Sequence, residues 1–315
     1  MKKFFALTLA VLTMAVTLAG CGGKSELTFI TGGDQGTYYG FGSVLAGQIS
    51  DSTETAVTAI VGKGSKGNIE AMSVGDAQLG FVQSDVMAYA YDGTNLFEES
   101  GKIDSFSTVA ALYMEQVQII TLDPAIKTVA DLKGKNVSVG DSGSGVYFNA
   151  LDVLGAYDLT LDDIKPTYQS FGDSAEALQD GKIDAAFIVA GAPTTAVTSL
   201  AATRDVYVVE LDDAHIEKLI ATSPYYSKSV IPAASYGLEH DATTVAVGAV
   251  IVANDDVAED DIYNVVSGIF ESIDTLAHDK KNELDLDFAS SVTAVPYHPG
   301  AAKYFSEKGI TVPTK

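Results

Sequence analysis

The chain has 315 residues, and 42 Asp and Glu against 19 Lys and Arg give it a formal net charge of −23 at pH 7. This balance argues against a nucleic-acid partner, which needs clustered Lys and Arg, and against electrostatic docking on anionic lipid. With 1 cysteine no intrachain disulfide can form, and the length is sufficient for two lobes with separate cores.

The N-terminus has the pattern of an export signal. Lys2 and Lys3 precede an apolar stretch over 4–18, which is shorter than the roughly 20 residues of a transmembrane helix. The sequence Leu-Ala-Gly-Cys at 18–21 resembles a bacterial lipobox, which implies cleavage before Cys21 and acylation of that cysteine. We therefore expect a signal peptide over 1–20, a lipidated cysteine and tether over 21–26, and a lipid-anchored protein outside the cytoplasm, at the cell surface or in the periplasm. An ordinary signal peptide with an incidental cysteine is the alternative.

Beyond the tether, apolar runs alternate with helical patterns, which is typical of βαβ units and largely parallel sheets. The patterns predict strands over 27–31, 56–61, 79–82, 109–122, 136–140, 185–189, 206–211 and 243–253. They predict helices over 38–49, 67–73, 146–156, 175–179, 212–221 and 255–277. The acidic start of the last helix complements the helix dipole. A calcium loop is the alternative there, but the run lacks the glycine of an EF-hand.

An internal repeat indicates two lobes of similar plan. The segment 36–45 returns at 145–154, and each copy follows a short strand and a glycine-rich polar turn. A helix-turn-strand ending recurs later, at 75–82 and 181–188. Chance similarity is the alternative, but three elements recur in the same order. We expect an α/β protein with a ligand cleft between two lobes and two hinge crossings. The predicted lobes are lobe I over 27–116 and 248–315, and lobe II over 117–247.

The two glycine-rich turns are the strongest signals of ligand binding. A helix N-terminus has unpaired N–H groups and positive partial charge, so it can hold a carboxylate without a cationic side chain. Thr37, Ser142 and Ser144 add hydroxyl donors. A tight strand-to-helix turn with no ligand is the alternative. The single arginine, Arg204, lies between a predicted helix and strand and is expected at the surface, so amides and hydroxyls would hold an anion.

Two more turns follow predicted strands, at 83–85 and 190–193, and open α/β sheets bind ligands at the carboxyl ends of their strands. Aromatic residues could form the cleft wall, although one of each adjacent pair should face the core. Loop polarity at 83–84 and a helix start at Pro193 are the alternatives. The candidate ligand-binding residues are Gly33, Gly36, Thr37, Tyr38, Tyr39, Ser65, Asn68, Gln83, Ser84, Ser142, Ser144, Gly145, Val146, Ala192 and Pro193.

Other chemistry finds little support in the sequence. The motif G-x-G-x-x-G at 62–67 is a weak dinucleotide fingerprint, because the expected acid could only be Asp85. The histidines, at 215, 240, 278 and 298, are scattered without metal-ligand spacing, and there is no G-x-S-x-G nucleophile motif. We expect no metal, no cofactor and no catalysis.

In chain order these motifs resemble one family, the solute receptors of TRAP transporters in the TAXI branch (TRAP-associated extracytoplasmic immunogenic proteins). The matching residues are Thr31-Gly32-Gly33 with Gly36-Thr37-Tyr38-Tyr39, Gly64-Ser65 with Asn68, Gln83-Ser84-Asp85, Asp131–Lys135, Gly143-Ser144-Gly145 and Asp180–Ala185. The resemblance implies a type II periplasmic-binding-protein fold, a monomer that delivers a carboxylate such as glutamate to TRAP membrane subunits. The chain departs at Val146, where the family more often has Thr, and so lacks one hydroxyl donor.

The sequence therefore predicts a lipid-anchored receptor for a small anionic or zwitterionic ligand. A ligand-sensing domain for a membrane signalling partner would have the same sequence features. A lipid-anchored hydrolase is the enzyme alternative.

Overall fold

The computed structural model describes residues 24–315, apart from the side chain at position 96. The predicted signal peptide and Cys21 lie outside the described residues. The strands are β1 (Ser25–Ile30), β2 (Thr55–Ile60), β3 (Leu79–Gln83), β4 (Phe106–Thr121), β5 (Asn136–Ser138), β6 (Lys165–Thr167), β7 (Ala185–Ala190), β8 (Tyr207–Val208), β9 (Ser227–Ile231) and β10 (Ala242–Asn254). The helices are α1 (Thr37–Ser52), α2 (Ser65–Ser73), α3 (Ser84–Asp92), α4 (Gly145–Ala156), α5 (Phe171–Gln179), α6 (Thr195–Ala201), α7 (Asp213–Thr222), α8 (Glu259–Phe270), α9 (Leu286–Ala289) and α10 (Pro299–Glu307).

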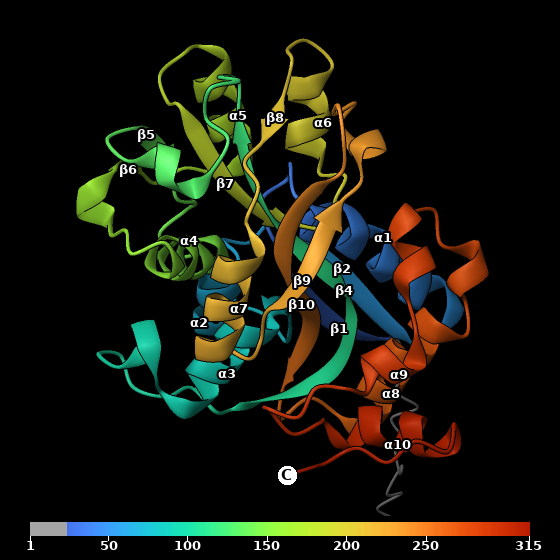
Figure 1. Cartoon of the computed structure of the whole chain (residues 1–315). Coiled ribbons are helices and arrows are strands. Elements are labelled where there is room, and N and C mark those ends of the chain that lie inside the picture. The colour runs from blue at the N-terminus through green and yellow to red at the C-terminus, as the bar shows by residue number, and fades with distance from the viewer. Residues whose placement is uncertain (1–23) are drawn as a thin grey trace, which may run out of the picture.

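All strands belong to one sheet, with the order β2-β1-β3-β10-β4-β7-β5-β6, and with β8 paired to β4 and β9 to β10 (Figure 1). We call the part that contains β1 to β3 and α8 to α10 the first lobe, and the part that contains β5 to β9 the second lobe. The long strands β4 and β10 run antiparallel to each other and extend into both lobes. They provide the two crossings that the sequence predicts. The strands beyond them pair in parallel, as expected, but β4 and β10 pair with other strands only in the antiparallel direction.

Side-chain alternation along the strands divides the first lobe into two layers. Along β10, Ala249, Ile251 and Ala253 face a cluster that contains α1, α8 and α10, whereas Val250 and Val252 face a cluster that contains α2 and α3. This alternation follows from the two-residue period of a strand. The C-terminal helices therefore return to the first lobe, as the sequence predicts, and cover one face of its sheet (Figure 1).

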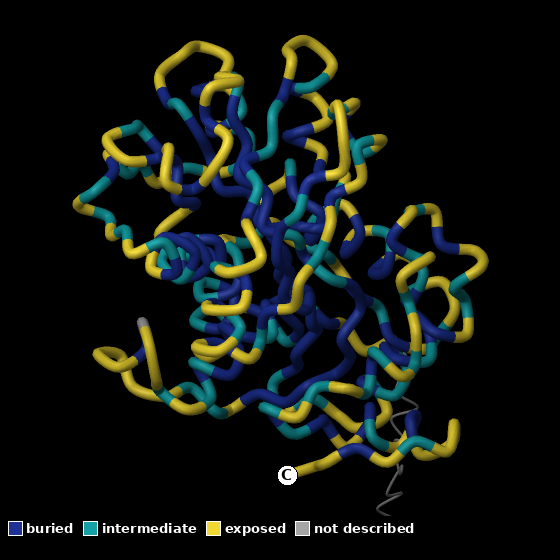
Figure 2. Tube along the Cα trace, in the orientation of Figure 1, coloured by how far each residue is buried: buried dark blue, intermediate teal, exposed yellow. Residues whose placement is uncertain are grey.

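The second lobe is layered in the same way. Val117 and Ile119 of β4 pack with α4 and α7 on one face, whereas Ile120 packs with α5 and α6 on the other. The buried segments form a continuous interior through both lobes along the central strands (Figure 2). One residue of the second lobe packs against the first lobe: Phe148 of α4 lies in the first-lobe cluster, with its ring stacked on Tyr89 at 6.0 Å between centroids. The lobes are thus in direct contact.

Two predicted elements differ from the structure. The helix predicted over 255–277 begins at Glu259 and ends at Phe270, and the chain continues in short 3-10 turns. The side chain of Thr275 donates to the backbone oxygen of Ser272 (2.8 Å), and such local bonds compete with helix continuation. The strand predicted over 206–211 is shortened to Tyr207–Val208. The other predicted strands and helices are present, and their ends differ from the predicted ones by a few residues.

Candidate ligand-binding site

A pocket lies between the two lobes beside the crossing strands. Its volume is about 630 Å³ including the part open to solvent. Residues of the first lobe and of β4 form one wall: Gly32, Gly33, Gly36, Thr37, Tyr38, Gly62, Lys63, Gly64, Ser65, Gln83 and Glu115. The opposite wall consists of Asp141, Ser144, Gly145, Val146, Gln169, Ser170, Phe171, Val189 and Ala190.

Five helices begin at this pocket. Their N-cap residues are Gly36 of α1, Gly64 of α2, Gln83 of α3, Ser144 of α4 and Ser170 of α5, and all five line it. Only Ser170 caps its helix with its own side chain; the other four N-caps form no side-chain cap. Because the N-terminus of a helix carries positive partial charge and unpaired N–H groups, their convergence favours an anionic group in the pocket.

The two glycine-rich turns of the sequence repeat meet across the pocket. The first turn leads into α1 and the second into α4, so the repeat places one helix N-terminus on each wall. The lobes touch at the rim, where the backbone N–H of Gly67 donates to the oxygen of Gly143 (2.9 Å). Gly64 has φ +90°, and a Cβ there would lie 3.1 Å from the Cα of Ser144. Glycine is required at this position by both conformation and close approach.

Most of the sequence-predicted site residues line this pocket, namely Gly33, Gly36, Thr37, Tyr38, Ser65, Gln83, Ser144, Gly145 and Val146. Tyr38 is the pocket residue of the adjacent pair: its ring is buried and stacks on Phe81 at 4.6 Å. The side chain of Ser65 accepts a hydrogen bond from the backbone N–H of Gln83 (3.0 Å). This bond ties the start of α2 to the end of β3.

The remaining predicted residues, Tyr39, Asn68, Ser84, Ser142, Ala192 and Pro193, do not line it. Asn68 is buried and donates to the backbone oxygens of Thr31 and Phe81, so it holds α2 against the sheet. Ser84 accepts from the backbone N–H of Gly248 (3.0 Å), which joins α3 to β10. Tyr39 is half-buried and Ser142 is exposed. Polar residues near a glycine turn thus serve the scaffold as well as the pocket.

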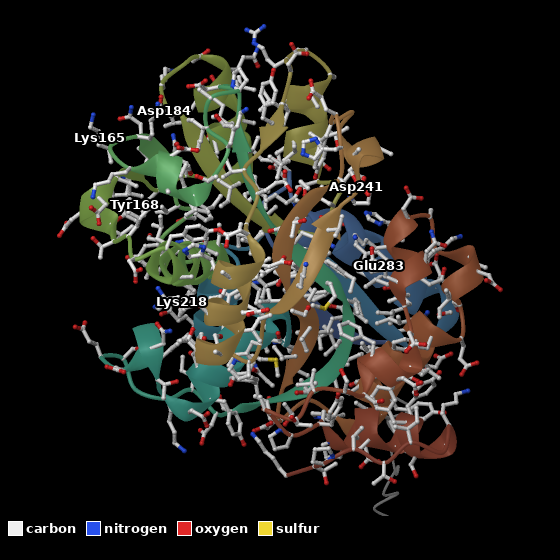
Figure 3. All side chains as sticks on the ribbon, viewed as in Figure 1. Lys165, Tyr168, Asp184, Lys218, Asp241 and Glu283 are labelled. Carbon is white, nitrogen blue, oxygen red and sulfur yellow. The ribbon has the colours of Figure 1, made fainter. Side chains whose placement is uncertain are left out.

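Ala192 and Pro193 line a neighbouring cavity together with residues of the C-terminal part of the chain. There the ammonium of Lys280 donates to the backbone oxygen of Ala192 (3.1 Å) and to Glu283, which Figure 3 labels. Lys280 is 4% exposed, and it belongs to the 3-10 segment Asp279–Glu283. This contact is a further bridge between the lobes.

Glu115 of β4 is the pocket residue that sequence reasoning missed. The residue is 2% exposed, and its carboxyl group accepts a hydrogen bond from the hydroxyl of Tyr38 (2.7 Å). Burial raises the pKa of Glu115 to about 8, so the carboxyl group is mainly protonated at pH 7. The available signal was a group of polar residues, Glu115, Gln116 and Gln118, in the middle of a mainly apolar strand. Gln116 in turn accepts from the backbone N–H of Ala192 (3.0 Å).

A buried polar network joins the lobes beside the pocket. Gln83 donates to Asn149 (2.9 Å), and Asn149 donates to Asp85 (3.0 Å) and to the hydroxyl of Tyr226 (2.7 Å). Tyr226 donates to Asp152 (2.9 Å). Burial, and then the charge of Asp152, raise the pKa of Asp85 to about 7. Within the described residues, one oxygen of Asp85 and one of Gln83 have no hydrogen-bond partner.

Other chemistry is not evident in residues 24–315. Arg204 is exposed and outside the pocket, as predicted from its position in a turn. Charged side chains such as Lys165, Lys218 and Asp241, labelled in Figure 3, are exposed. In this part of the chain no group of three His, Cys, Asp or Glu side chains is placed to hold a metal ion. No helix of the same residues combines the length and the apolar character needed to cross a membrane.

Two lobes joined by two long strands, with a pocket between them, define a type II periplasmic-binding-protein fold. Solved structures agree at the level of fold. The alkanesulfonate-binding protein SsuA from Xanthomonas axonopodis pv. citri, bound to MOPS, has a TM-score of 0.51 at 16% identity, over 90% of this chain and 83% of that one. An ancestral arginine-binding protein bound to arginine has a TM-score of 0.52 at 16% identity, over 83% and 98%. A putative L-cystine ABC transporter protein from Listeria monocytogenes has a TM-score of 0.50 at 15% identity, over 86% and 99%.

The family is shown by the sequence itself. Residues 29–309 match the profile of the NMT1-like family. The match covers nearly all of the described chain, and this protein belongs to the NMT1-like family.

Proposed function

We propose that this protein is an extracytoplasmic solute-binding receptor, not an enzyme, that captures a small carboxylate or amino acid between its lobes. The observation that carries the proposal is the convergence of five helix N-termini on one interlobe pocket. Such a pocket can hold an oxyanion with backbone amides alone. The only arginine lies elsewhere at the surface, so the amides and hydroxyls of the pocket carry this role, together with Lys63 in its wall.

Ligand binding would shift an equilibrium between open and closed arrangements of the lobes. We place the division near residues 116–117 of β4 and 247–248 of β10. Core clusters support this division, because residues 27–113 and 249–312 pack separately from residues 117–247, except for Phe148. Thr37 contributes a contact of the closed form, since its hydroxyl donates to the backbone oxygen of Gly191 (2.9 Å).

The hydrogen bond made by the Ser144 hydroxyl also favours a receptor role over a hydrolase role. Its hydroxyl donates to the backbone oxygen of Asp141 (2.6 Å). A serine nucleophile instead donates to a general base such as a histidine. The hydroxyl of Ser144 therefore supports the end of a turn.

The similar structures include proteins described as binding an alkanesulfonate and arginine. We propose that the present protein delivers its ligand to a membrane transporter, as a monomer of the TAXI branch working with TRAP subunits. The lipobox-like sequence at 18–21 suggests that a lipid on Cys21 anchors it to the bacterial membrane.

Calorimetric titration after unfolding and refolding, which removes carried-over ligand, tests the receptor role. The panel contains amino acids, 2-hydroxy acids, dicarboxylates and alkanesulfonates. A ligand at 100 times its Kd adds about 2.7 kcal/mol of stability, so a thermal shift of several degrees should accompany binding. If no anion on the panel binds, the proposed function is wrong.

A further inference from the structure

The pocket contains an acid where its helix N-termini favour an anion. Glu115 lies in the wall of the same pocket as the N-termini of α1 and α4, and it is 2% exposed. Its partner is the neutral hydroxyl of Tyr38. The cation that acts on it, Lys280, is already bonded to Glu283 and to the backbone oxygen of Ala192. The pocket thus offers positive dipole ends and an acid that lacks a cation of its own.

The groups that face Glu115 come from several elements. Burial has the largest effect and raises its pKa, and the carboxylate of Asp85 on α3 raises it further. The Tyr38 hydroxyl of α1, Lys280 and the amide of Gln83 lower it. Tyr113 of β4 is a further buried neighbour, and its own pKa is raised by burial and by Glu115. The result is a carboxyl group with a pKa of about 8, which holds its proton at pH 7.

We propose that Glu115 binds the ammonium group of an amino-acid ligand and releases its proton to the solvent as that ligand binds. This inference rests on the proposed function and identifies the residue that selects among carboxylates. The O–H bond of Glu115 breaks, the ligand keeps its –NH₃⁺ group, and the resulting carboxylate accepts hydrogen bonds from it. The ligand's own carboxylate lies at the helix N-termini. An opposite charge nearby favours the ionised form of a buried acid, so binding and ionisation support each other.

Most of the groups that act on Glu115 lie in its own lobe. Tyr38, Gln83 and Asp85 belong to the first lobe, and Tyr113 lies two residues before Glu115 on β4. These groups stay with Glu115 if the second lobe moves away. A 2-hydroxy acid has no ammonium group and therefore leaves Glu115 protonated.

The test compares amino acids with 2-hydroxy acids of the same carbon skeleton, for example L-glutamate with L-2-hydroxyglutarate and L-alanine with L-lactate. Titrations at pH 7 in two buffers of different ionisation enthalpy report the protons released. For the wild type we expect release of about one proton per amino acid and none per hydroxy acid. Affinity for the amino acid should rise by up to about tenfold per pH unit below pH 8 and level off above it.

The variant Glu115→Gln keeps the shape and can still accept from Tyr38. We expect it to bind the amino acid at least about tenfold more weakly, to bind the hydroxy acid as the wild type does, and to release no proton. Glu239→Gln, a change at an exposed acid, is the matched control and should behave as the wild type. If Glu115→Gln does not fold, the two-buffer titration of the wild type decides alone.

Three results would separate the inference from the proposed function. If hydroxy acids bind as tightly as amino acids, or if amino acids bind without proton release, the role of Glu115 is wrong and the receptor role stands. If proton release persists in Glu115→Gln, another acid such as Asp85 supplies it, and the inference fails in the same way. If no anion binds at all, both proposals fail together.

Discussion

The close approach of Gly145 to the first lobe predicts that a single methyl group weakens closure. A Cβ at Gly145, the first residue of α4, would lie 1.8 Å from Oε1 of Gln83, 2.5 Å from its Cδ and 2.9 Å from Oγ of Ser65. Non-bonded atoms pack at about 3.5 Å, so Gly145→Ala requires a displacement of about 1.5 Å. The Gln83 side chain cannot move freely, because it donates to Asn149 (2.9 Å) within the buried network.

Overpacking of this kind costs about 1–3 kcal/mol. Since Gln83 lies in the first lobe and Gly145 in the second, opening relieves the overlap, and the cost falls on the closed form. A loss of about 2 kcal/mol corresponds to a Kd about 30-fold higher. The thermal midpoint without ligand should change little. Calorimetry with any ligand from the panel measures the Kd, and thermal unfolding without ligand measures the stability.

Gly155→Ala in the same helix is the matched control. A Cβ at Gly155 has no heavy atom within 4 Å, and the residue is exposed. This variant should bind as the wild type does and should be slightly more stable, because alanine favours a helix. The reasoning is refuted if Gly145→Ala binds with wild-type affinity, whether or not it unfolds at a lower temperature.

Three other predictions use the same purified protein. Folding raises the pKa of Asp85 from 3.8 to about 7, so its contribution to stability decreases as the pH rises from about 4 to 7. Asp85→Asn should therefore gain stability relative to the wild type between pH 5 and pH 8 in urea unfolding, and an equal difference at both pH values would contradict this. Asn149→Ala removes the partner of Gln83 and Asp85. Each buried group left unpaired costs about 1–3 kcal/mol of free energy, so both the ligand affinity and the thermal midpoint should fall. Unchanged values would show that the network contributes nothing. On α1, Gly47→Ala places its Cβ in open space and should add about 0.5–1 kcal/mol to the free energy of unfolding. Gly42→Ala places a Cβ 2.8 Å from Thr31 and should lower the thermal midpoint by several degrees. A shift of the same sign in both variants would refute the assignment of Gly42 to a close contact and of Gly47 to open space.

The sequence predicts well what depends on neighbouring residues. The strand, glycine-rich turn and helix of each lobe appear where expected, because the apolar period and the turn residues act locally. The N-termini of α1 and α4 line one pocket, because equivalent turns lie at equivalent ends of the two half-sheets. The type II fold follows from the same order of elements.

What the sequence could not predict depends on contacts between distant segments. Glu115 lies in a strand that is buried on both faces, so a period of two residues cannot indicate which face borders the pocket. Asn149 lies in the middle of α4, where an amide is expected at the surface, and its partners are 64 to 77 positions away along the chain. The prediction that Ser84 lines the pocket was wrong for the same reason, because its partner Gly248 belongs to the returning strand β10.

The glycines of the pocket rim have a second explanation besides the approach of a ligand. Gly64 meets Ser144, and Gly145 meets Gln83 and Ser65, so the absence of side chains allows the two lobes to touch each other. The backbone bond from Gly67 to Gly143 lies at the same place. A glycine-rich turn in such a protein therefore serves two contacts at once, with the ligand through its amides and with the opposite lobe through its missing Cβ. Because Gly145→Ala leaves every backbone amide in place, it separates these two contributions, and a selective loss of affinity would assign the glycine to closure.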